Sequence, residues 1–129
     1  MEEFFKQLTK QIKDCEKIIF MTHQNMDLDG FASILALSEV ADAFKKVNYI
    51  LINNKFTNTS INKSLDKLKS EQLFFNYIYK KDVTKVLTDK AIIIVLDVHK
   101  PSMVEMPSLL EKCPNIIVID HHIKCKQYI

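Results

Sequence analysis

Hydrophobic positions follow two different spacings along the chain. Short continuous runs of Ile, Val and Leu are typical of strands buried on both faces of a sheet, and apolar residues three and four positions apart are typical of amphipathic helices. Such apolar runs predict strands at 18–22, 92–96 and 116–119, the stretch 47–52 reads as a further strand, and 76–79 is a candidate for a short one. The helical spacing predicts helices at 4–15, 30–46, 64–75 and 103–112, and a brief helix near Leu87.

The predicted helices therefore alternate with the predicted strands along most of the chain. Strands that read as unbroken apolar runs are typical of parallel sheets, whose right-handed crossovers place helices on both faces. A length of 129 residues with 47% hydrophobic residues provides one core and leaves no room for two ordinary domains. We predict a doubly wound, Rossmann-like α/β fold in which residues 1–129 form one domain.

The charge and the apolar content argue against several classes of protein. The net charge is +2, and all 18 basic residues are lysines spread along the chain, so no surface for duplex nucleic acid is predicted. No apolar run approaches the roughly 20 residues of a membrane-spanning helix, and the first residues are acidic where a signal peptide is basic. We therefore expect this segment to be cytoplasmic, with no direct membrane contact.

The cysteine and glycine residues argue against several kinds of structural and nucleotide-binding site. Three cysteines without a C-x-x-C spacing suggest neither a disulfide framework nor a thiolate zinc site, and they fit a reducing compartment. Gly30 is the single glycine, so neither the G-x-G-x-x-G fingerprint nor the P-loop motif can be present. A dinucleotide or P-loop site of the usual kind is thus excluded.

Polar side chains of metal-binding type follow three of the predicted strands. The first strand is followed by His23, Asp27 and Asp29, the 92–96 strand by Asp97, and the last strand by Asp120, His121 and His122. Because the carboxyl ends of parallel strands meet at one edge of the sheet, we expect these side chains to converge. One pocket would then contain four carboxylates and three imidazoles.

Such a concentration of carboxylates is unfavourable unless cations neutralise it, because like charges raise one another's pKa values. Carboxylate and imidazole ligands without thiolates favour Mn²⁺, with Mg²⁺ or Fe²⁺ as alternatives. Two such ions about 3.5–4 Å apart can clamp a phosphoryl group and lower the pKa of a bound water. The residue pattern therefore predicts metal-dependent phosphoester hydrolysis.

Three motifs in the correct order resemble those of the DHH phosphoesterase superfamily. Residues 23–29, H-Q-N-M-D-L-D, are similar to its first motif, H-x-N-P-D-x-D, and residues 120–122 match the D-H-H triplet. Residues 97–105, D-V-H-K-P-S-M-V-E, resemble the D-T-H-R-P-S-M-V-E segment of the GdpP-type cyclic-di-AMP phosphodiesterases. The resemblance covers the chain from about Lys17 to its end.

The resemblance implies a role for each motif residue. One Mn²⁺ would be held by His23, Asp27 and Asp97, and a second by Asp29, Asp97 and His121, so that Asp97 bridges the two. The remaining residues are expected to act on the substrate or to orient the ligands. They are His122, which would contact the substrate phosphate, Asp120, which would orient the neighbouring imidazoles, and the pocket neighbours Asn25, His99 and Ser102.

Simpler interpretations exist for several of these residues. An isolated aspartate after a strand is commonly a helix cap, and His99 alone could merely satisfy a local hydrogen bond. The joint spacing of the three motifs favours function for the ligand set. Four neighbouring aromatic residues could stack bases, but a cluster at an element boundary is more often core, so we predict core positions for Phe74, Phe75, Tyr77 and Tyr79.

The sequence also departs from the family pattern. Met26 replaces the common proline, Gly30 stands two positions before the usual glycine, and no aspartate follows Asp120, although the family supplies a further one to the second metal. The substrate-binding DHHA1 domain of the family is missing as well. We therefore expect a truncated N-terminal lobe that is weakly active or inactive alone.

The resemblance gives one expected function and leaves two alternatives. We expect a two-manganese phosphodiesterase domain that opens cyclic-di-AMP to pApA. The alternatives are a nanoRNase or pAp phosphatase of the same superfamily, and a non-catalytic regulatory module that binds metal or nucleotide. The expected partner is a cyclic dinucleotide or a short oligonucleotide, with a homodimer as a further expectation. GdpP-type proteins are membrane-anchored, so the parent protein would be as well.

Overall fold

The computed structural model describes residues 1–52 and 58–129, in which helices alternate with five strands. The strands are β1 (Lys17–Met21), β2 (Val47–Ile52), β3 (Tyr77–Tyr79), β4 (Ala91–Leu96) and β5 (Ile116–Ile119). The helices are α1 (Glu2–Asp14), α2 (Leu28–Ala43), α3 (Thr59–Ser70), α4 (Lys80–Val86) and α5 (Pro107–Lys112), and a short 3-10 helix, η1, spans Pro101–Met103.

The strands form one parallel sheet in the order β3-β2-β1-β4-β5. Central strand β1 pairs on both sides, so that Ile19 lies opposite Tyr49 of β2 and Ile93 of β4. The chain first winds from β1 towards β3 and then continues from β4 to β5 on the other side. Winding therefore reverses between β1 and β4, which is where open α/β sheets bind their ligands. The doubly wound prediction is confirmed.

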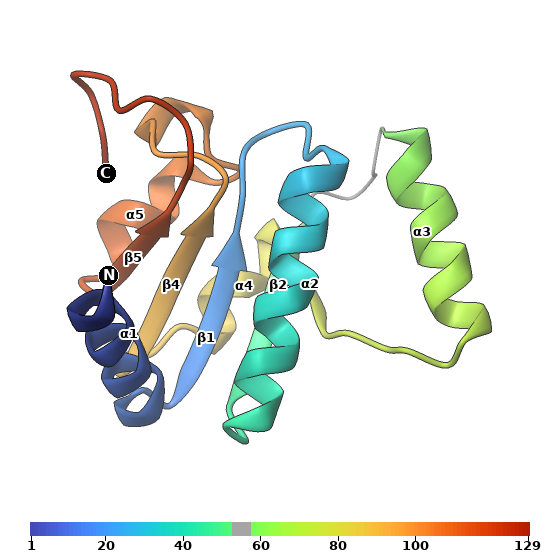
Figure 1. Ribbon diagram of the computed structural model, residues 1–129, viewed down its shortest axis with the longest axis horizontal. Coiled ribbons are helices and arrows are strands. Elements are labelled where there is room, and N and C mark those ends of the chain that lie inside the picture. The colour runs from blue at the N-terminus through green and yellow to red at the C-terminus, as the bar shows by residue number, and fades with distance from the viewer. Residues whose placement is uncertain (53–57) are drawn as a thin grey trace.

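Helices cover both faces of the sheet, with α1 and α2 in front of it and α4 and α5 behind it in Figure 1. Alternate side chains of each strand enter two separate cores. On one face Phe20 packs with Phe31 of α2, and on the other Met21 packs with Leu109 of α5. Each fully buried side chain of this size contributes about 1.5–3 kcal/mol. The two cores fix the strand ends from which the polar motifs emerge.

The helix predicted at 64–75 begins and ends too late in the sequence. In the structure α3 begins at Thr59, because the side chain of Asn58 accepts hydrogen bonds from the backbone N–H groups of Ser60 and Ile61. Soon after Ser70, the left-handed backbone of Gln72, with φ of 59°, interrupts the helical geometry. The cap and the left-handed residue decide the bounds, not the apolar spacing.

The helix predicted at 103–112 is wrong in its first half. Met103 belongs to η1, and α5 begins at Pro107, whose fixed φ suits a first helical turn. Between them Val104 forms an antiparallel bridge with His23. Residues 104–106, which we call the strap, therefore lie beside the loop after β1.

The aromatic residues before β3 divide between the core and the surface. Phe75 and Tyr77 pack against the core that contains α2, as predicted. Phe74 and Tyr79 are 77% and 40% exposed, so the core prediction is wrong for these two. Phe74 lies in the connection between α3 and β3, where no sheet face covers it.

No helix in the described part of the chain is both long enough and apolar enough to cross a membrane.

Candidate metal centre

The three polar clusters lie at the carboxyl ends of β1, β4 and β5, which are neighbours in the sheet. Each cluster starts within two residues of the end of its strand, so the sheet itself determines where the side chains meet. The backbone N–H of Asp97 donates to the carbonyl of Ile119 over 3.0 Å and joins the ends of β4 and β5. The expected convergence is therefore present in the structure.

His23 is oriented by its own backbone neighbour. Its Nδ1 lies 2.7 Å from the carbonyl oxygen of Gln24, and because a carbonyl only accepts, Nδ1 must carry the proton. The lone pair on Nε2 then points towards the carboxylates, 3.6 Å from Asp27 Oδ1 and 3.8 Å from Asp97 Oδ2. This tautomer is the one that leaves Nε2 available as a metal ligand.

Asp27 has two functions at the start of α2. As the N-cap it accepts a hydrogen bond from the backbone N–H of Gly30 over 2.9 Å, through Oδ1. This hydrogen bond lowers the pKa of the Asp27 carboxyl against the opposing effect of burial. The carboxylate is therefore held in its ionised form beside His23.

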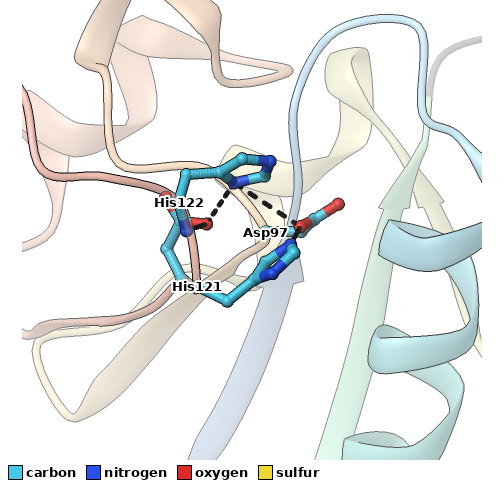
Figure 2. A group of neighbouring side chains, drawn as sticks. Asp97, His121 and His122 are labelled. Carbon is cyan, nitrogen blue, oxygen red and sulfur yellow. Dashed lines mark hydrogen bonds and ion pairs between the residues drawn. The ribbon is translucent and has the colours of Figure 1, made fainter.

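Asp97 lies between the two halves of the site. Its backbone has a left-handed φ of 62°, and its side chain is 6% exposed. Oδ2 faces His23, and Oδ1 lies 3.1 Å from His121 Nε2. Figure 2 shows the imidazoles of His121 and His122 directed at this carboxylate from the loop after β5. Asp97 is thus placed to bridge two ligand groups.

Asp29 lies in the first turn of α2, and its Oδ2 is 3.7 Å from His121 Nε2. Both side chains are far more exposed than that of Asp97, at 69% and 70%. The structure therefore brings Asp29 to the edge of the cluster rather than into its centre.

Asp120 holds two imidazoles through its two oxygens. His99 Nε2 accepts a hydrogen bond from the backbone N–H of Cys125 over 3.1 Å, so the ring proton of His99 is on Nδ1. His99 Nδ1 therefore donates to Asp120 Oδ2. Oδ1 lies 2.6 Å from His122 Nδ1. Burial raises the pKa of Asp120, but the hydrogen bonds from His99 and His122 outweigh it and lower the pKa to about 2. The hydrogen bond between His122 and Asp120 also raises the pKa of the His122 imidazole.

Two groups of side chains in the described residues could hold a metal ion, and within each group the ligand atoms lie within 4.8 Å of one another. The first group contains His23, Asp27 and Asp97, and the second contains Asp97, Asp120, His121 and His122. The second group has Asp120 and His122 where Asp29 was expected. Ionised carboxylates together with imidazole nitrogens fit a divalent cation, which would relieve the repulsion among the acids.

A cavity of about 520 Å³ adjoins the first group. Its lining contains His99 and His122 from the predicted set, and also Lys100, Met103 and Ile123, which the sequence pattern did not single out. Lys100 could have been found, since it lies inside the motif at 97–105. Met103 and Ile123 give no signal in the sequence that distinguishes them from other apolar residues.

Two predicted pocket residues lie outside this cavity. Asn25 is exposed in the loop after β1, with a left-handed φ of 55°, and Ser102 is exposed within η1. Neither lines the cavity next to the ligands. Their expected contact with the substrate stays a prediction.

Known proteins match this chain over most of its length. The family model described as "DHH family, N-terminal domain" matches residues 17–129. The cyclic-di-AMP phosphodiesterase GdpP of Bacillus subtilis (strain 168) is 27% identical over 123 residues, covering 95% of this chain and 19% of that protein. A membrane protein–large ribosomal subunit bL9 fusion protein of Aster yellows witches'-broom phytoplasma (strain AYWB) is 32% identical over 107 residues, covering 79% of this chain and 12% of that protein.

A solved structure is similar over the whole chain. The exopolyphosphatase-related protein from Bacteroides fragilis superimposes with a TM-score of 0.70 at 21% identity, covering 100% of this chain and 38% of that one. At this identity the likeness supports the fold alone. The chain spans about a fifth of the length of the GdpP relative.

Proposed function

The chain belongs to the DHH family, as the match to its N-terminal domain over residues 17–129 establishes, and from this premise we propose that it is the metal-binding domain of a cyclic-di-AMP phosphodiesterase. One observation carries the proposal. Asp97, at the reversal of the sheet, lies between His23 on one side and His121 on the other, at 3.8 Å and 3.1 Å. A single buried carboxylate with imidazoles on both sides suits a bridge between two cations.

We assign the ligands as the family resemblance implies. His23, Asp27 and Asp97 would hold one Mn²⁺, and Asp29, Asp97 and His121 the other. Bound divalent cations supply charge for the phosphoryl oxygens and a water of lowered pKa for in-line attack. The protein's contribution would be to keep both Asp97 oxygens and the two Nε2 atoms directed inwards, and the carbonyl of Gln24 holds the His23 ring in this orientation.

His122 is the group that we expect to contact the scissile phosphate. Its Nδ1 is held by Asp120, and the raised pKa of the imidazole favours the protonated, positively charged form. A positive imidazole can donate from Nε2 to a phosphate oxygen. Lys100, at the wall of the same cavity, adds a second positive charge near the phosphate.

The choice of substrate is supported by sequence likeness. Residues 97–105 resemble the matching segment of the GdpP-type enzymes, and the Bacillus relative named as a cyclic-di-AMP phosphodiesterase aligns over 95% of this chain. We therefore propose hydrolysis of cyclic-di-AMP to linear pApA. Membrane attachment is proposed for the whole protein on the likeness to the phytoplasma membrane protein.

One observation favours a second candidate, a module that binds metal or nucleotide without turnover. Asp29 and His121, both expected to hold the second cation, have largely exposed side chains, and Asp29 does not belong to the second compact ligand group. A site with only one well-formed metal position would bind a nucleotide phosphate but hydrolyse it poorly.

Chromatography of reaction products separates these candidates. With Mn²⁺ and cyclic-di-AMP we expect little or no pApA from residues 1–129 alone, pApA from a longer protein that includes a substrate-binding domain, and none from that longer protein with Asp97→Asn. Competition with short oligoribonucleotides and pAp tests the related superfamily activities, because a preferred oligoribonucleotide would replace cyclic-di-AMP as the substrate. Binding of Mn²⁺ and cyclic-di-AMP by the longer protein without any product would favour the module that binds without turnover.

A further inference from the structure

Thr22 carries a buried hydroxyl group that lacks a partner. The residue follows β1 directly and is 0% exposed, and its Oγ1 has no hydrogen bond to any described residue. Its backbone carbonyl, by contrast, accepts from the N–H of Glu105 over 2.8 Å. Buried hydroxyl groups in native proteins nearly always have a partner, so an isolated one points to a partner that comes within reach when a ligand binds.

The hydroxyl faces the metal centre across Gly30. A Cβ on Gly30 would lie 2.8 Å from Thr22 Oγ1, 3.4 Å from Asp97 Oδ2 and 3.5 Å from Asp27 Oδ1. The hydroxyl oxygen of Thr22 and one oxygen from each of two carboxylates therefore all lie within 3.5 Å of the same point. The chain's single glycine occupies this position and leaves the point free of side-chain atoms.

Asp97 has one oxygen with spare capacity to accept a hydrogen bond. Oδ1 lies 3.1 Å from His121, but the nearest contact given for Oδ2 in the described residues is His23 Nε2 at 3.8 Å, beyond hydrogen-bonding distance. The unused donor of Thr22 and the underused acceptor Oδ2 of Asp97 thus both lie within 3.4 Å of the Cβ position of Gly30.

We propose that Thr22 is a positioning residue of the metal centre, whose hydroxyl donates to the Asp97 carboxylate when that carboxylate holds a cation. The inference rests on the proposed metal-dependent function. Hydrogen bonds to ligating carboxylates fix their orientation, and loss of such partners typically lowers metal affinity about 10- to 100-fold. Gly30 has a matching role, because the Cβ of any other residue would crowd both the hydroxyl oxygen of Thr22 and Oδ2 of Asp97.

A purely structural role for Thr22 predicts a different result. If the hydroxyl only fills space, Val is an isosteric replacement that removes an unsatisfied polar atom, and nothing at the metal centre should change. If the hydroxyl serves Asp97, the same replacement leaves the metal-free protein as stable as before or more stable, while metal binding weakens. The two roles therefore differ in metal affinity and agree in stability.

Calorimetric titration with Mn²⁺ tests the proposal. For Thr22→Val we expect the Kd for Mn²⁺ to rise about 10- to 100-fold, while the melting temperature in EDTA is unchanged or a few degrees higher. Thr22→Ser, which keeps the hydroxyl, should restore the wild-type Kd. Thr84→Val on the exposed face of α4 is the matched control and should leave the Kd unchanged.

Two results would overturn the proposal. One is a wild-type Kd for Thr22→Val, and the other is failure of Thr22→Ser to recover affinity in a folded protein. If Thr22→Val does not fold, the smaller Thr22→Ala is titrated instead, and the same loss of affinity is required of it. Absence of Mn²⁺ binding by the wild-type protein is a separate outcome, which contradicts the proposed function itself.

Discussion

Asp97 combines two features that rarely occur together at a single residue. It is a buried acid, and it adopts a left-handed backbone conformation that costs most residues about 1 kcal/mol or more but that Asp and Asn tolerate. Such local strain tends to concentrate at functional sites. Here the left-handed turn lies directly after β4, where the carboxylate faces both His23 and His121.

Asp97→Asn should separate the backbone role of this residue from its charge. Asn keeps the left-handed conformation, so we expect a folded protein, while affinity for Mn²⁺ falls by more than about 100-fold because the bridging charge is lost. Titration calorimetry and circular dichroism measure the two effects. Asp66→Asn, an exposed acid on α3, is the control and should bind like the wild-type protein. Retained affinity in Asp97→Asn would exclude Asp97 as a ligand.

The sequence predicted most of the residues that meet at this site, because strand ends followed by Asp and His are visible in it. Their proximity is observed, and their roles remain predictions. Thr22 could not be found in this way, since its importance lies in an absent hydrogen bond that only the packing reveals. The high exposure of the Asp29 side chain could not be predicted from the sequence either, because it depends on the geometry of the first turn of α2.

At the scale of single elements, the first turn of α2 links folding to ligand placement. Asp27 both caps the helix and faces His23. We expect Asp27→Asn to keep the cap and change the free energy of unfolding of the metal-free protein by less than about 0.5 kcal/mol, and Asp27→Ala to lose about 1 kcal/mol. Both should lose affinity for Mn²⁺. Chemical denaturation in EDTA and Mn²⁺ titration give the two quantities.

The cap of α3 provides a control for this comparison. Asn58→Ala removes the side chain that accepts from Ser60 and Ile61, so it should also cost about 1 kcal/mol but leave the affinity for Mn²⁺ unchanged. If Asp27→Asn binds Mn²⁺ like the wild-type protein, Asp27 is only a cap.

The strap between η1 and α5 is a second element that supports the site. Val104 bridges to His23, and the adjacent Glu105, 6% exposed, pairs with Lys80 at the start of α4 over 3.0 Å. We expect Glu105→Gln to lower the free energy of unfolding by about 1–2 kcal/mol, since Lys80 loses a buried partner. Urea denaturation measures this.

An exposed ion pair gives the matched control for the strap. Glu71→Gln breaks a pair with Lys67 at 4.0 Å on the surface of α3 and should cost less than about 0.5 kcal/mol. Equal losses in the two variants would show that the Glu105 pair does not hold the strap.

Elements were predicted well where burial alone determines them. The strands of a sheet covered on both faces are continuous apolar runs, and β4, which is buried throughout, differs from the predicted strand at 92–96 by a single residue. The errors fell where local hydrogen bonds or proline decide the bounds, at the Asn58 cap of α3 and at Pro107 of α5. Apolar spacing contains no information about either.

At the scale of the whole molecule, two cores surround a sheet whose exposed carboxyl edge concentrates negative charge. A ligand that binds only the folded state stabilises it, by about 2.7 kcal/mol at a concentration 100 times its Kd. We therefore expect saturating Mn²⁺ to raise the melting temperature by about 10 °C, and EDTA to reverse the change. An equal rise for Asp97→Asn would place the binding elsewhere.

The proposed function depends most on cations bound at the edge of the sheet where β1, β4 and β5 end. An anomalous difference map from crystals grown with Mn²⁺, recorded at the manganese absorption edge, tests this directly. We predict two peaks that share Asp97, one about 2.2 Å from His23 Nε2 and the other about 2.2 Å from His121 Nε2. A map without peaks at these atoms, or with Mn²⁺ only at other surface acids, would contradict the proposed metal centre.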